Sequence, residues 1–178
     1  MNTLADFQGI KSRAPENPIN IAELEALGCI PTPMAWNELY TGLQQGTVDG
    51  LVSSKMPIIQ QGLIDVLKYA TDTNHSYSIN VILISSANPR CKYNSFSEEQ
   101  RAAYDKAIAG AAEEEWKIAM KEEEDSVQKI KELQEQGKIL YTELTDEARA
   151  EIKEAMVAAT EPKVEEMCGK EILETFRN

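Results

Sequence analysis

Apolar positions in the first third of the chain outline a strand, a helix and a second strand. Apolar side chains recur at positions i, i+3, i+4 and i+7 from Trp36 to Leu43, which predicts a helix with one buried face. The prolines of residues 31–33 keep the preceding segment extended, and Gly46 is placed to end the helix in the left-handed conformation. The short apolar run at residues 48–52 then predicts a strand. This order is typical of a parallel α/β sheet.

The flanking segments continue the same alternation. Residues 10–14 predict a short strand that ends at Pro15, and a helix with a buried apolar stripe follows Pro18. Residues 66–71 predict another short strand. The aliphatic run at residues 81–84 has the pattern of a strand that is covered on both faces. The first half of the chain therefore predicts an α/β fold class with a parallel-type sheet.

The pattern becomes helical from residue 97 onward. Ser97 and Gln100 form a capping-box motif, and apolar residues then recur at helical spacing, without a proline, until Gly137. They predict one long helix, with residues 122–125 as a candidate break, and further helices follow. A helix of about 40 residues is about 60 Å long, which exceeds the width of a small lobe. Such a helix needs two bodies or a partner chain to rest on, which makes residues 97–134 a candidate for self-association.

Charge and composition exclude several classes of function. The 178 residues are 42% hydrophobic and 27% charged, which is typical of one globular domain with a core. The net charge of −12 argues against nucleic acids and anionic lipids as partners. No apolar run approaches the roughly 18 residues of a membrane span. Residues 1–6 lack the basic and apolar regions of a signal peptide.

The sequence contains no motif that predicts catalysis. It has no nucleophile elbow, phosphate-binding loop or dinucleotide fingerprint. His75 is the only histidine, and its place in a polar loop favours a structural hydrogen bond. Cys29, Cys91 and Cys168 lack metal-site spacing and fit buried or surface thiols, with one disulfide left open. We therefore expect neither an enzyme nor a cofactor or metal site.

Arg13 is the strongest candidate for ligand binding. It stands at the end of a predicted strand, and open parallel sheets bind ligands beyond the carboxyl ends of their strands. Its guanidinium can hold a carboxylate through two parallel hydrogen bonds, which a lysine cannot do. From the residues alone, a surface ion pair is an equal alternative for Arg13. Trp36 likewise fits either the core or a ligand cleft.

Several segments, in the same order, resemble one family. They are residues 7–18 (FQGIKSRAPENP), 31–40 (PTPMAWNELY), 43–50 (LQQGTVDG) and 68–77 (KYATDTNHSY), followed by the late acidic helices. These motifs are similar to those of the DctP-type solute-binding proteins of tripartite ATP-independent periplasmic (TRAP) transporters. The resemblance covers the later part of the family's sequence, so most of the first lobe is expected to be absent.

The resemblance implies a periplasmic-binding-protein-like fold with a parallel-type sheet lobe and long C-terminal helices. It divides the chain into an α/β ligand-binding lobe at residues 1–96 and a helical part at residues 97–178. The long helix and the C-terminal helices of that second part are expected to pack on the lobes or to cross between them.

The resemblance also implies a function in transport. The family works in the periplasm, where it captures a small organic acid by its carboxylate and hands it to the TRAP membrane permease. It implies that Arg13 clamps the carboxylate and that Trp36 lines the ligand cleft. Ser53 stands where the family has a ligand-binding asparagine, and Glu16 stands where some members carry asparagine. Both are candidate ligand-binding residues, and both departures leave the identity of the ligand open.

Two other functions remain as alternatives. Either the chain is a truncated, non-binding remnant that folds or dimerises through its long helix, or it is an interaction or sensor module that presents ligand state to a receptor. Loss of every ligand response favours the remnant, whereas ligand-dependent binding to a receptor domain favours the sensor. A charged hydrogen bond contributes roughly 1.5–3 kcal/mol, against about 8 kcal/mol for micromolar affinity. We therefore expect weak or absent ligand binding by this chain alone.

Overall fold

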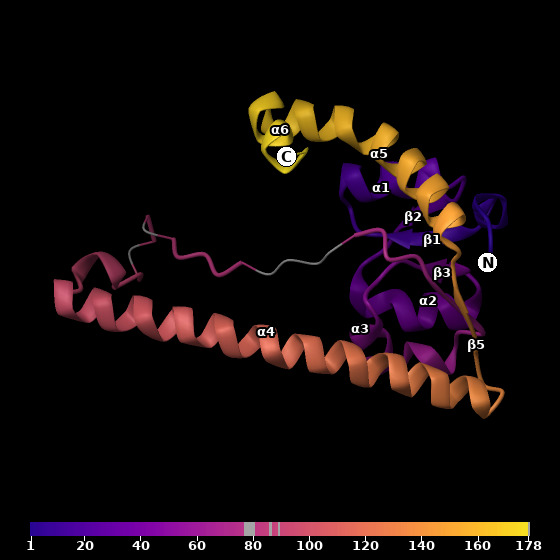
Figure 1. The fold of residues 1–178 in the computed structure, drawn as a ribbon, viewed down its shortest axis with the longest axis horizontal. Coiled ribbons are helices and arrows are strands. Elements are labelled where there is room, and N and C mark those ends of the chain that lie inside the picture. The colour runs from indigo at the N-terminus through magenta and orange to yellow at the C-terminus, as the bar shows by residue number, and fades with distance from the viewer. Residues whose placement is uncertain (77–80, 86, 89, 178) are drawn as a thin grey trace.

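A parallel sheet lies at the centre of the first half of the chain (Figure 1). The computed structural model describes residues 1–76, 81–85, 87–88 and 90–177. Residues 176 and 177 are described by their backbone alone. Within the described residues, the first sheet has the strand order β2-β1-β3, with bounds β1 (Lys11–Ala14), β2 (Ile30–Pro33) and β3 (Gly50–Leu51). Arg13 of the central strand lies opposite Thr32 on one side and Leu51 on the other.

The helices between these strands lie on opposite faces of the first sheet. The connections are α1 (Pro18–Ala26), between β1 and β2, and η2 (Trp36–Glu38) with α2 (Leu39–Gln45), between β2 and β3. The chain steps from β1 outward to β2 and then back past β1 to β3. Because parallel crossovers are right-handed, the two steps place α1 and α2 on different faces.

Local sequence signals fix where these helices begin and end. The Asn17 side chain accepts a hydrogen bond from the backbone N–H of Ile19 at 2.8 Å, which caps α1 ahead of Pro18. Gly46 ends α2 with φ of 72°, a conformation that glycine adopts without the strain of a Cβ atom. The predicted stop of this helix at Gly46 is thereby confirmed.

A second sheet pairs strands that are far apart in the sequence. Strand β4 (Tyr69–Asp72) runs parallel to β5 (Leu140–Glu143), and the long helix α4 (Glu98–Glu135) lies between them in the chain. The strand predicted at residues 66–71 is therefore present, shifted toward the C-terminus. The strand between α2 and α3 (Lys55–Gln60) is shorter than predicted, since β3 comprises only residues 50–51.

The prediction of a doubly covered strand at residues 81–84 is wrong. These residues form no strand, and their side chains are between 41% and 86% exposed. The aliphatic pattern indicates only that the segment suits a covered strand. In the described part of the chain, no strand pairs with it and no layer covers it.

The long helix α4 extends well beyond the sheets (Figure 1). Its predicted capping box is present, because Gln100 N–H donates to the Ser97 hydroxyl and Ser97 N–H donates to the Gln100 side chain. The helix continues without a break through residues 122–125. Its C-terminal part is packed through Ser126, Ile130 and Leu133, and near its N-terminus Tyr104 contacts the rings of Tyr93 and Phe96. Residues 109–121 between these parts are exposed.

The chain ends in two helices, and the core is divided among separate clusters. The helix α5 (Asp146–Cys168) packs on α1 and continues through Pro162, and α6 (Lys170–Arg177) follows it. The cluster between α1, α5 and the N-terminal turn η1 (Leu4–Phe7) contains Phe7, Ala14, Leu24, Leu27, Cys29, Leu144, Ala148, Ile152 and Met156. A second cluster, around α2, contains Leu39, Val48 and Leu63, and a third, between α4 and β5, contains Ile130, Leu133 and Ile139. Segments from both halves of the chain thus share cores and sheets.

Candidate ligand-binding site

A pocket of about 240 Å³ lies at the carboxyl ends of the strands of the first sheet. Each strand contributes a residue that follows it, namely Pro15 after β1, Trp36 after β2 and Ser53 after β3. The other lining residues are Arg13, Asn20, Glu23, Leu24, Val52, Ser54 and Met156. Parallel strands end at one edge of their sheet, and this edge is where open α/β sheets bind ligands.

The Arg13 guanidinium is held in place by two neighbours from the segment after β2. Its Nε–H donates to the backbone oxygen of Met34 at 2.9 Å. Its Cζ atom lies 5.4 Å from the centre of the Trp36 ring, a cation–π distance. Burial lowers the pKa of Arg13, but an arginine keeps its positive charge in proteins. In the described part of the chain Arg13 forms no ion pair, so the surface ion pair that was its alternative is not found there.

Trp36 belongs to the pocket and is only partly covered. Its residue is 36% exposed, whereas Leu39 is fully buried on the α2 face. The predicted buried face from Trp36 to Leu43 is therefore only partly correct, and Tyr40 on it is also exposed. The reason is that residues 36–38 form a 3₁₀ turn, whose tighter winding changes the direction of Trp36 relative to the helix that follows.

The structure separates the other two candidate residues. Ser53 is half-buried and lines the pocket just after β3. Glu16 lies in the exposed turn between Pro15 and the helix cap Asn17, and it is not among the residues that line the pocket. The structure thus gathers Arg13, Trp36 and Ser53 in one place and leaves Glu16 outside it.

Two polar residues of this pocket were not predicted from the sequence. Asn20 and Glu23 lie one turn apart on α1, and the Asn20 side-chain amide donates to Glu23 Oε2 at 2.9 Å. Their spacing of three, in a helix that begins directly after the end of β1, is a signal that could have identified them. Met156 reaches the pocket from α5, and no local signal in the sequence places it there.

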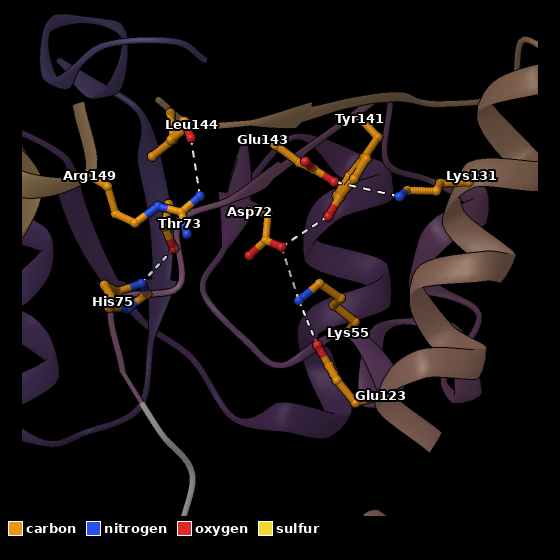
Figure 2. Close-up of polar contacts among 10 residues, drawn as sticks. All are labelled: Lys55, Asp72, Thr73, His75, Glu123, Lys131, Tyr141, Glu143, Leu144 and Arg149. Atoms are coloured by element: carbon orange, nitrogen blue, oxygen red, sulfur yellow. Dashed lines mark hydrogen bonds and ion pairs between the residues drawn. The ribbon is translucent and has the colours of Figure 1, made fainter. Parts of the chain in front are cut away.

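A second polar cluster joins the second sheet to the helices α3 and α4 (Figure 2). Lys55 Nζ lies 2.6 Å from Glu123 Oε1 of α4 and 3.3 Å from Asp72 Oδ2 of β4. The Tyr141 hydroxyl of β5 donates to Asp72 Oδ2 at 3.0 Å. Burial by itself lowers the pKa of Lys55, but the hydrogen bond to Glu123 and the charge of Asp72 raise it overall. We call Lys55, Asp72, Glu123 and Tyr141 the Lys55 network.

His75 follows β4 and has a local partner (Figure 2). Its Nδ1 lies 2.5 Å from the Thr73 hydroxyl, a hydrogen bond that agrees with the structural role predicted for this histidine. Burial lowers the pKa of His75, and the nearby charge of Glu23 opposes that shift in part. The polar loop predicted around His75 spans residues 73–78, of which residues 77–78 lie outside the described residues.

The described residues show no metal centre and no membrane helix. No three His, Cys, Asp or Glu side chains among them gather closely enough to hold a metal ion. No helix in the same part of the chain is long and apolar enough to cross a bilayer. Cys29 is buried, Cys91 is half-buried and Cys168 is exposed, and all are free thiols.

Comparison with known proteins identifies the family. The family model described as DctP, bacterial extracellular solute-binding protein, family 7, matches residues 1–167. A solute-binding protein of Verminephrobacter eiseniae is 32% identical over 174 residues, which are 97% of this chain and 48% of that protein. The C4-dicarboxylate-binding periplasmic protein DctP of Rhodobacter capsulatus is 29% identical over 167 residues, 94% of this chain and 48% of that protein.

A solved structure gives the same result for the fold. The periplasmic ectoine-binding protein of the TeaABC TRAP transporter from Halomonas elongata matches with a TM-score of 0.80 and 28% identity, covering 98% of this chain and 54% of that chain. The predicted fold class, an α/β periplasmic-binding-protein-like fold with long helices, is confirmed. The chain spans about half the length of the relatives it matches. The family consists of substrate-binding transport proteins rather than enzymes. The chain belongs to the DctP family of bacterial extracellular solute-binding proteins, family 7.

Proposed function

We propose that this chain carries the ligand pocket of a TRAP-type solute-binding protein, which captures an organic acid in the periplasm and delivers it to the membrane permease. Within it, residues 1–96 act as the ligand-binding lobe and residues 97–178 as helices that pack on or cross between lobes. The observation that supports this proposal is the position of Arg13, held by Met34 and Trp36 in a pocket at the strand ends.

The chemistry of Arg13 favours a carboxylate. Its Nε–H already donates to Met34, and its Nη groups form no hydrogen bond within the described residues. A carboxylate can accept two parallel hydrogen bonds from such a guanidinium. Ser53 offers a hydroxyl to the same pocket and Trp36 an aromatic face. The relatives from Rhodobacter capsulatus and Halomonas elongata are named for C4-dicarboxylates and ectoine, which are both carboxylates.

Magnitudes limit the affinity of this pocket alone. Charge-assisted hydrogen bonds contribute roughly 1.5–3 kcal/mol each, and micromolar binding requires about 8 kcal/mol. In binding proteins that close around a hinge, a second surface covers the ligand and supplies further contacts. We therefore expect the isolated chain to bind acids weakly, and a longer protein with an opposing surface to bind them tightly.

Thermal unfolding tests the proposal. The chain is melted with mono- and dicarboxylates, sugar acids and keto acids, each with an Arg13→Lys variant in parallel. A ligand at about ten times its Kd stabilises the folded state by about 1.4 kcal/mol, which raises the Tm by roughly 3–5 °C for a chain of this size. Lysine keeps the charge but cannot form the paired hydrogen bonds, so the rise should largely disappear in the variant.

Arg101→Lys is the matched control for this measurement. Arg101 also lies over an aromatic ring, with its Cζ atom 5.6 Å from the centre of the Tyr93 ring, but it does not line the pocket. The control variant should keep the full ligand response. The proposal is wrong if no acid stabilises a chain that unfolds cooperatively, or if the stabilisation survives in Arg13→Lys.

A further inference from the structure

Glu23 gives the pocket a second polar end that is separate from Arg13. One of its carboxylate oxygens, Oε2, accepts a hydrogen bond from the Asn20 amide at 2.9 Å. The other oxygen, Oε1, has no hydrogen-bond partner among the residues that the structure describes, and no cation there forms an ion pair with Glu23. Glu23 is half-buried and lines the pocket together with Asn20. Glu23 therefore brings a negatively charged hydrogen-bond acceptor to the same pocket as Arg13.

The charges of the lining residues cancel. Arg13 contributes one positive charge and Glu23 one negative charge, and the other lining residues are uncharged. His75 lies close enough to Glu23 for the two charges to interact, but burial lowers the pKa of His75 and keeps it neutral near pH 7. A ligand with two carboxylates is attracted to Arg13 and repelled by Glu23, because like charges in a partly desolvated site destabilise each other.

We infer that Glu23 selects acids that carry, besides the carboxylate held by Arg13, a cationic amine that donates to Glu23, and that it disfavours dicarboxylates. The inference rests on the proposed function of the Arg13 pocket. An ammonium group placed at Glu23 forms a charge-assisted hydrogen bond to Oε1, which is stronger than a bond between neutral groups. Asn20 holds the carboxylate in position for that contact.

Matched pairs of probes separate the two kinds of acid. β-Alanine and succinate share two methylene groups and differ only in the terminal group, an ammonium or a carboxylate. γ-Aminobutyrate and glutarate form the same pair with three methylene groups. Each probe is titrated into a Trp116→Phe chain, in which Trp36 is the remaining tryptophan. Trp116 lies on an exposed part of α4 and does not line the pocket, so the emission then reports on the pocket alone.

The expected result is a preference that depends on Glu23. In the Trp116→Phe chain the amino acid of the better-bound pair should bind more tightly than its dicarboxylate partner. Adding Glu23→Gln, which keeps the size and loses the charge, should weaken the amino acid about tenfold and leave or improve the dicarboxylate. Glu25→Gln makes the same change of charge at an exposed position of α1 outside the pocket, and it should leave the preference unchanged.

Two different failures can be told apart. If the acids bind in a manner that requires Arg13, but the dicarboxylates bind more tightly or the preference is the same in Glu23→Gln, the inference is wrong and the proposed function stands. If none of the four probes binds, although another acid stabilises the chain in a manner that requires Arg13, the inference alone is wrong. If no acid binds in a manner that requires Arg13, both the inference and the proposed function are contradicted.

Discussion

Two neighbours restrain the Arg13 side chain, which suits the role in ligand binding that we propose for it. Its Nε–H donates to the Met34 backbone oxygen at 2.9 Å, and its Cζ atom lies 5.4 Å from the centre of the Trp36 ring. A side chain that is already restrained loses less freedom on binding a carboxylate. A lysine at this position would have neither the planar fork nor the same contact with the ring. The binding prediction for Arg13→Lys follows from this geometry.

His75 predicts a dependence of folding stability on pH. Burial lowers its pKa in the folded chain below the value of about 6.5 expected for an unfolded chain. The unfolded state therefore binds the proton more readily, and the folded state loses stability as the pH falls from about 6.5 through the folded pKa. His75→Gln removes the titrating group and retains a polar partner for Thr73, so this part of the loss should disappear.

Urea unfolding at several pH values between 8 and 5.5 measures this effect. Carboxylates with lowered pKa, such as Asp6 and Glu147, titrate at lower pH and contribute equally to both proteins. The relevant quantity is thus the difference between the wild-type chain and His75→Gln. Parallel stability curves for the two proteins would show that His75 is not perturbed by folding.

The pocket could be predicted from the sequence only where its residues follow strands. Arg13, Trp36 and Ser53 stand at or after the ends of β1, β2 and β3, and the sheet brings those ends together. Glu23 could have been found from its place in the first turns of α1. Met156 could not, because its approach to the pocket depends on the packing of α5 on α1, more than 100 residues away along the chain.

Among the helices and strands, features that depend on neighbouring residues were predicted more reliably than features that depend on distant parts of the chain. The capping box at Ser97 and the glycine stop at Gly46 depend on neighbouring residues, and both were predicted correctly. The strand predicted at residues 81–84 depends on partners elsewhere in the chain, and none of the described strands pairs with it. Strand formation reflects packing against neighbours, which a single segment does not encode.

The exposed apolar side chains of α4 lead us to expect that copies of this chain associate in a concentration-dependent manner. Trp116 and Met120, one turn apart on this helix, are 71% and 48% exposed. Apolar side chains that share a helix face lose contact with water when two such faces meet. We expect sedimentation to show a dimer or larger species that increases with concentration, and Trp116→Glu to shift the chain toward the monomer.

Ala111→Glu is the control for this helix. It introduces the same charge at another exposed position of α4 and should leave the association unchanged. Wild-type chain that sediments as a monomer at all concentrations would contradict this prediction, which concerns the helix and not the ligand pocket.

At the scale of the whole molecule, polar contacts join the second sheet to the helices beside it. The Lys55 network joins α3, β4, α4 and β5 through Lys55 and Asp72, whose side chains are only 17% and 14% exposed (Figure 2). Because α3 begins directly after Ser53 and Ser54, the same contacts also anchor one edge of the ligand pocket. Removing the cation leaves Asp72 half-buried without its charged partner.

Lys55→Met tests the importance of this network. The substitution preserves much of the side-chain length, and it should cost about 1–3 kcal/mol of unfolding free energy because a desolvated carboxylate loses its cation. Lys117→Met removes an exposed ion pair with Glu114 on α4 and should change stability by less than about 0.5 kcal/mol. Equal effects of the two substitutions in chemical denaturation would show that the Lys55 network contributes no more than a surface ion pair.

The most direct test of the proposed function is to observe the Arg13 side chain itself while a ligand binds. Arginine Nε–H signals are followed by NMR while β-alanine or succinate is added, and the signal missing from Arg13→Lys assigns the resonance. We predict that the Arg13 signal shifts in a saturable manner, together with the indole N–H of Trp36, while the signal of Arg101 stays in place. Saturable binding of an acid that shifts the signals of other residues but leaves the Arg13 signal unchanged would contradict the proposed role of Arg13.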